Sequence, residues 1–150
     1  MSWKKYFYVD EFQEPTKNPY LTNYPKFEGT FKNIAVENAP LKAQLLIDNK
    51  YVCIMLYEYG EDLLKPIYDT TCDITLLDET GNKHYMSGYI KEYGDRIFLH
   101  DKHRIPFIRL LRANEKLKIH IVLSNNYSKS KETYLFSILR ENFKQEFASL

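Results

Sequence analysis

A period-two alternation of apolar and polar residues is the feature that most limits what this chain can fold into. In residues 41–48 almost every second side chain is apolar, and residues 117–124 repeat the pattern. Such alternation predicts a strand with one face in a core. The signal recurs between turn-forming residues and predicts an all-β fold, an antiparallel β-sandwich or partly closed barrel of about 8–9 strands. The expected strands are 3–9, 26–34, 41–48, 51–59, 72–77, 83–90, 96–99, 117–123 and 133–138.

Two segments depart from this pattern. Apolar residues at helical spacing predict one short helix near residues 104–112 and a C-terminal helix near 141–149. Pro106 is expected in the first turn of the first helix, where its missing N–H costs nothing. Asp101 is a candidate N-cap for that helix.

The two ends of the chain carry large apolar residues, whereas the segment after the first strand does not read as regular structure. Trp3 is the only tryptophan, and Phe143 begins an apolar stripe in the tail. We therefore expect both termini to dock on the β structure. Residues 10–25 contain three prolines, which predict an extended surface loop.

Length and composition bound the class of protein. The chain has 150 residues, a size typical of a single domain, so we expect one β-sandwich domain over 1–150. Its formal charge of +1 argues against nucleic acid as a partner.

The longest apolar run, residues 52–57, is far below the roughly 18 residues of a spanning helix, so no membrane span is expected. The first residues lack a signal-peptide pattern; the protein is cytoplasmic if Met1 is the native start and extracytoplasmic if a leader was trimmed.

Cysteine and glycine usage exclude several chemistries. Cys53 and Cys72 are expected to be reduced, buried hydrophobes, because no CxxC motif is present and a domain of this size needs no disulfide. The 5 glycines form no dinucleotide-binding or phosphate-binding motif, and no cofactor is expected. His100 and His103 have a spacing compatible with metal binding, but no further ligand is indicated nearby, so no metal site is predicted.

Positive charge is concentrated between residues 96 and 118. Because the interleaved phenylalanines fall on the expected core stripe, we interpret these cations as a solvated helix face and strand edge rather than a nucleic-acid surface. Carboxylates gather in residues 10–14, where a flexible loop is a poor scaffold for catalysis. They are interpreted as a solvated turn or as contacts for a basic partner.

Tyrosine is unusually frequent in this chain, with 13 copies. Tyrosine is common in strands, and it is also a favoured recognition residue because it is large, rigid and amphipathic. Prolines that restrict residues 10–25 lower the entropy that this segment loses on binding. The candidate binding residues are therefore Phe12, Tyr20 and Tyr24.

A recognisable layout is formed by Trp3, 8–16, 20–23, 28–33, 41–48, 57–60, 134–138 and Phe143. This layout resembles a group of uncharacterised bacterial β domains, of the type common in Bacteroidetes, found on lipoproteins and small stand-alone chains. The resemblance covers most of the chain and departs at Asn142, where relatives often have glycine. It implies a compact β domain and assigns no activity or catalytic residue.

Taken together, these features favour a non-enzymatic binding or interaction module for a protein or another macromolecular partner. Two alternatives stay open. One is a small hydrolase with a site built from histidine and carboxylate side chains. The other is an inhibitor from a phage or mobile element that acts by occlusion. Neither the partner nor the oligomeric state follows from the residues.

Overall fold

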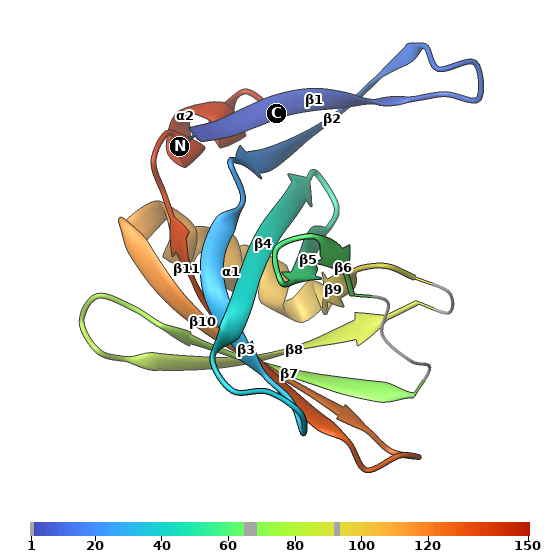
Figure 1. The fold of residues 1–150 in the computed structure, drawn as a ribbon. Helices are drawn as coiled ribbons and strands as arrows, with labels where there is room; N and C mark the ends of the chain where they lie inside the picture. Colours follow the sequence, from blue (N-terminus) through green and yellow to red (C-terminus); the bar gives the residue numbers. More distant parts are fainter. Residues whose placement is uncertain (1, 65–68, 92–93) are drawn as a thin grey trace.

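Eight antiparallel strands close into a barrel (Figure 1). The computed structural model describes residues 2–64, 69–91 and 94–150. The eight-strand order runs from β4 through β3 to β5, and the sheet closes because β4 also pairs with β5. The all-β prediction is confirmed, in its barrel form. In order around the barrel the strands are β3 (Phe27–Lys32), β4 (Ala39–Asp48), β5 (Val52–Glu58), β9 (Ile97–Leu99), β8 (Lys83–Ile90), β7 (Thr70–Leu77), β10 (Lys116–Asn125) and β11 (Lys131–Leu139). A two-residue strand, β6 (Asp62–Leu63), pairs with the end of β5.

The alternating residues point where the sequence predicts. The apolar positions of 41–47 and 117–123 are buried in one core cluster, and the polar positions between them are mostly on the outer surface. Gly29 lies where β3 approaches β11 closely, and a Cβ there would collide with the Leu135 carbonyl oxygen. A glycine inside a strand thus permits the close backbone approach of this barrel wall.

The predicted loop over residues 10–25 is wrong for most of its length. β1 (Ser2–Val9) and β2 (Pro15–Tyr24) form a long antiparallel hairpin, here called the arm, that projects from the barrel (Figure 1). Pro15 and Pro19 lie in the half of β2 that, among the described residues, pairs with β1 alone. Prolines are tolerated at such an edge, because a strand without a second neighbour needs fewer N–H donors.

The other end of the arm is built into the barrel through Asn23. β4 pairs with β3 as far as Ala43 and with β2 from Leu46 onward. Between these two pairings of β4, the buried Asn23 side chain accepts a hydrogen bond from the Leu45 N–H (2.8 Å) and donates one to the Ala43 carbonyl (3.3 Å). One amide side chain therefore replaces the missing strand neighbour and keeps buried backbone groups paired.

Two helices complete the core. α1 (Asp101–Ala113) connects β9 to β10 and buries Phe107, Ile108 and Leu111, and α2 (Phe143–Ala148) follows β11. Both predicted helices are confirmed in position. α1 begins earlier than expected, so Pro106 is its sixth residue rather than part of its first turn, on an exposed face where water can solvate the freed carbonyl group. His100, not Asp101, occupies the N-cap position, and it makes no side-chain capping bond.

Both termini dock on the barrel as expected. The Trp3 N–H donates to the Asn142 side-chain oxygen (2.6 Å), and the Asn142 amide donates to the Trp3 carbonyl (3.0 Å). The Trp3 indole N–H donates to the Leu139 carbonyl, and its ring packs edge-on against buried Phe143, with centroids 5.1 Å apart. The two ends of the chain are thus held together by paired hydrogen bonds and an aromatic contact.

Candidate functional site

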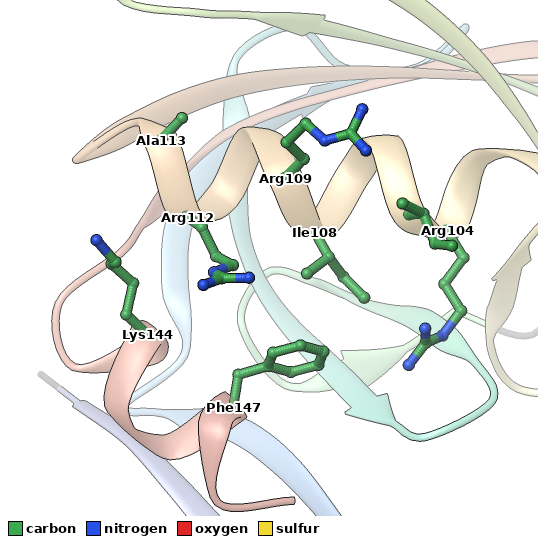
Figure 2. A pocket seen from close by; sticks show the side chains of 8 residues that line it. Arg104, Ile108, Arg109, Arg112, Ala113, Lys144 and Phe147 are labelled. Carbon is green, nitrogen blue, oxygen red and sulfur yellow. The ribbon is translucent and has the colours of Figure 1, made fainter.

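A groove of about 490 Å³ runs between α1 and α2, which are in contact (Figure 2). Its apolar part includes Ile108 and Phe147, which face each other across the groove. Arg104, Ile108 and Arg112 are four residues apart along α1, a spacing that places them on one stripe of the helix. The described residues that line it are Arg104, Ile105, Ile108, Arg109, Arg112, Ala113, Lys144 and Phe147.

The groove carries four cations, Arg104, Arg109, Arg112 and Lys144, and none of the described carboxylates lines it. Within the described parts of the chain, no ion pair involves any of these four side chains. The whole chain has a formal charge of only +1, so this is a local concentration of positive charge. A concave, positive surface with an apolar floor attracts anions that also carry an apolar group.

Arg104 is the most constrained of these cations. Its Nη2 donates to the Asp48 carbonyl (2.6 Å), which ties the side chain to the β4–β5 turn. Its buried Nε has no hydrogen-bond partner among the described residues. Arg109 and Arg112 are exposed, so the groove combines one anchored guanidinium with two freely solvated ones.

The predicted binding residues do not form one patch. Phe12 lies in the turn at the tip of the arm and is 76% exposed, Tyr20 is half-buried in the middle of β2, and Tyr24 is exposed at its end. Tyr20 and Tyr24 are about 13 Å apart along the strand. The structure brings Tyr20 together with Tyr6 and Tyr8 instead, with ring centroids 5.8 and 4.6 Å away.

A second apolar cluster accounts for four of the 13 tyrosines. On the outer face of β4 and β5, buried Leu46, Cys53 and Met55 are covered by aromatic side chains from the arm and the barrel. The Tyr8 hydroxyl donates to Asp48 (2.8 Å), and burial with this bond raises the pKa of Tyr8. The covering side chains are Tyr8, Tyr20, Tyr51, Tyr57, Leu63 and Phe98. Tyr8 and Tyr20 therefore attach the arm to the sheet surface.

Both cysteines are free and buried, as predicted. Cys53 belongs to the outer cluster, whereas Cys72 belongs to the main core. Burial raises the pKa of each thiol to about 12, which keeps them protonated and unreactive at neutral pH.

The surroundings of the histidines are relevant to the hydrolase alternative. His103 lies 3.4 Å from the Ser87 hydroxyl, and burial lowers its pKa. In the described ranges, neither His100 nor His103 pairs with a carboxylate, and no three potential metal ligands cluster. The one histidine–carboxylate pair there is His84 with Asp78 (2.8 Å). Asp78 also accepts bonds from Thr80 and Asn82, so this pair belongs to the β7–β8 turn.

Sequence reasoning identified the arginines of α1 but assigned them to a solvated face. The four-residue spacing places Arg104, Ile108 and Arg112 on one stripe of a helix, and this could be predicted from the sequence. That Lys144 and Phe147 line the same groove could not be predicted, because they belong to α2, more than thirty residues away in the chain. Only the docking of α2 beside α1 turns the arginine face into a groove.

No described helix combines the length and the hydropathy needed to cross a membrane. Comparisons with protein-family models, curated proteins and solved structures found no match to this chain. The resemblance to the Bacteroidetes-type domains therefore stays a prediction.

Proposed function

We propose that this protein is a non-enzymatic binding module that holds an acidic polypeptide segment in the groove between α1 and α2. The observation that carries the proposal is a set of four cations that have no acidic partner among the described residues and surround an apolar floor. Charge-assisted hydrogen bonds from arginine to carboxylate are among the stronger polar contacts. A ligand supplying both carboxylates and an apolar side chain satisfies both parts of the groove.

The spacing within the groove suggests the pattern of the bound segment. Arg104 and Arg112 are eight residues apart in α1, which corresponds to about 12 Å along the helix axis. In an extended peptide, residues i, i+2 and i+4 point to one side, and i and i+4 are about 13 Å apart. A segment with one acidic residue at i, an apolar residue at i+2 and a second acidic residue at i+4 therefore matches the groove. The two acidic residues face Arg104 and Arg112, and the apolar residue lies over Ile108 and Phe147.

Nucleic acid fits the groove less well. Single-stranded nucleic acids bind by stacking bases on aromatic faces along a cationic track. One face of the Phe147 ring already stacks on Phe143, with centroids 5.3 Å apart. The remaining floor is aliphatic, which favours an apolar side chain over a phosphate.

The test is a binding titration with a labelled peptide of sequence Gly-Glu-Gly-Phe-Gly-Glu-Gly. We expect Arg112→Glu to weaken binding at least about tenfold, because it replaces attraction with repulsion. Lys131→Glu is the matched control, since it makes the same charge change at an exposed residue outside the groove, and it should leave affinity unchanged. The proposal fails if both variants bind equally, if a peptide with lysine in place of glutamate binds as well, or if a short oligothymidylate binds more tightly.

A further inference from the structure

The tip of the arm has the chemistry that the groove lacks. Three carboxylates, Asp10, Glu11 and Glu14, surround Phe12 in the turn between β1 and β2. Phe12 is the large apolar residue furthest along the arm from the barrel, and three quarters of its surface is exposed. An exposed aromatic side chain among acids is complementary to an apolar floor among arginines.

The tip is ordered before it meets any partner. One Asp10 carboxylate oxygen accepts hydrogen bonds from the N–H groups of Phe12 (2.9 Å) and Glu14 (3.0 Å). Backbone bonds from Asp10 to Glu14 and from Gln13 to Asp10 close the turn. A preorganised turn loses little conformational entropy on binding, so Phe12 is presented in a fixed position.

The tip lies far from the groove of its own molecule. Trp3, at the other end of β1, contacts α2 through Asn142 and Phe143. Asp10 is seven residues further along the extended chain, about 23 Å away, and the arm points away from α2 (Figure 1). An occupant of the groove supplied by the arm must therefore come from another molecule.

We propose that the groove between α1 and α2 of one molecule binds the arm tip of a second copy of this chain. Phe12 rests on Ile108 and Phe147, and the acidic residues of the tip face Arg104, Arg109, Arg112 and Lys144. The inference rests on the proposed function, since it names the partner of the same groove. Its basis is the complementary charge of the two surfaces, three carboxylates against four cations, on a chain that is nearly neutral as a whole.

This contact joins two different surfaces, so a pair of molecules keeps one free tip and one free groove after the first association. Such head-to-tail contacts form rings or open chains rather than a symmetric pair. A single turn in a groove buries less than the roughly 1,200 Å² of a standard stable interface. The association is therefore weak, rises with concentration and is reduced by salt.

The first measurement is sedimentation velocity of the full chain at concentrations from about 10 µM to about 1 mM. In low salt the average sedimentation coefficient should rise with concentration, and high salt should suppress the rise. Phe12→Ser and Arg112→Glu should each abolish it. Both side chains are exposed, so neither variant should disturb the fold, and circular dichroism checks this.

The decisive measurement mixes the two variants. Arg112→Glu keeps an intact tip and Phe12→Ser keeps an intact groove, so the mixture should form a 1:1 complex that grows no further. Self-association that persists in Phe12→Ser, or two variants that stay monomeric when mixed, would overturn the inference. If the labelled acidic peptide binds the groove while the wild-type chain stays monomeric at the highest concentration, the inference fails and the proposed function survives. If the peptide does not bind either, both fail.

Discussion

The two halves of the arm are made from the same pair of strands and have opposite surroundings. The base, residues 2–6 and 20–24, buries Trp3, Leu21 and Asn23 against the barrel and α2. The outer half, residues 7–19, leaves Phe7, Val9 and Phe12 exposed. The base pairs with β4 and contacts α2. Among the described residues the outer half pairs only with its own partner strand, and its Tyr8 contacts the barrel through a hydrogen bond to Asp48.

This difference separates stability from recognition within one hairpin. An isolated two-stranded ribbon is marginally stable in water, so the outer half depends on the base for its order. Exposed apolar residues that contribute little to the fold are free to bind a partner. The comparison therefore predicts large stability effects in the base and small ones at the tip.

The largest effect is expected for Trp3→Ala. The substitution removes a buried ring and leaves a cavity beside Phe27 and Phe143, a class of change that costs about 3–5 kcal/mol. The free energy of unfolding, measured by chemical denaturation, checks this value. Phe7→Ala, on the same face of the same strand but in the outer half, should change it by less than about 0.5 kcal/mol. Equal losses in the two variants would remove the distinction between base and outer half.

A smaller loss is expected for Asn23→Ala. Without the amide, the buried Leu45 N–H and Ala43 carbonyl lose their side-chain partner, and an unsatisfied buried group costs about 1–3 kcal/mol. Urea denaturation should show a lower midpoint with an unchanged slope. Asn18→Ala makes the same substitution on the exposed part of β2 and should leave the midpoint in place. A stable Asn23→Ala variant would show that β2 does not need this bridge to β4.

The barrel itself should carry a pH-dependent contribution to stability. Burial raises the pKa of Glu58, whose carboxylate accepts a hydrogen bond from Tyr134 and lies beside Glu132. A carboxyl group whose pKa is higher in the folded state than in the unfolded state binds its proton more tightly when folded. Its contribution is therefore full at low pH and is lost as the pH rises from the unfolded pKa through the folded one.

Glu58→Gln should remove this dependence. The variant is expected to be more stable than the wild type at neutral pH, by less than about 1 kcal/mol because the side chain is partly exposed. The difference should vanish below the ordinary glutamate pKa of about 4.3. Thermal melts across this pH range test the sign, and a variant that is less stable than the wild type at neutral pH would contradict it.

The smallest effect on stability is expected for Phe12→Ala at the tip. The side chain is mostly exposed, so its removal should shift the free energy of unfolding by less than about 0.5 kcal/mol. The same variant should lose concentration-dependent association. A large loss of stability would show that the tip packs against the molecule in solution, and the outer half would then resemble the base.

Sequence reasoning predicted the features that are encoded within a short segment and missed those that depend on distant residues. Residues 41–48 and 117–123 were predicted as strands because each carries its own alternation, and both lie in strands. β2 was missed because three prolines in 10–25 outweighed the strand signal. The free-energy cost of a proline in a strand depends on whether a second strand needs its missing N–H. Which strands lie side by side is decided by the tertiary structure and not by the local sequence.

The candidate site shows the same limit. The sequence identified Phe12 and the arginines of α1 as unusual, yet it joined Phe12 to Tyr20 and Tyr24 and dispersed the arginines on a solvated face. In the structure Tyr20 holds the arm to the barrel, and the arginines meet Lys144 and Phe147. Residue type can be read locally, whereas convergence of distant residues cannot.

By itself, the sequence determined which faces of the strands are apolar, where the two helices lie, and that both cysteines are buried. These properties depend on the period of hydrophobicity along a short segment, which each segment carries within itself. Only the tertiary structure decided that the sheet closes through β4, that Asn23 replaces a missing strand neighbour, and that four cations share one groove. Those outcomes depend on hydrogen-bond register and on packing between elements far apart in the chain, because backbone pairing is satisfied by whichever strand lies alongside and not by the local residues alone.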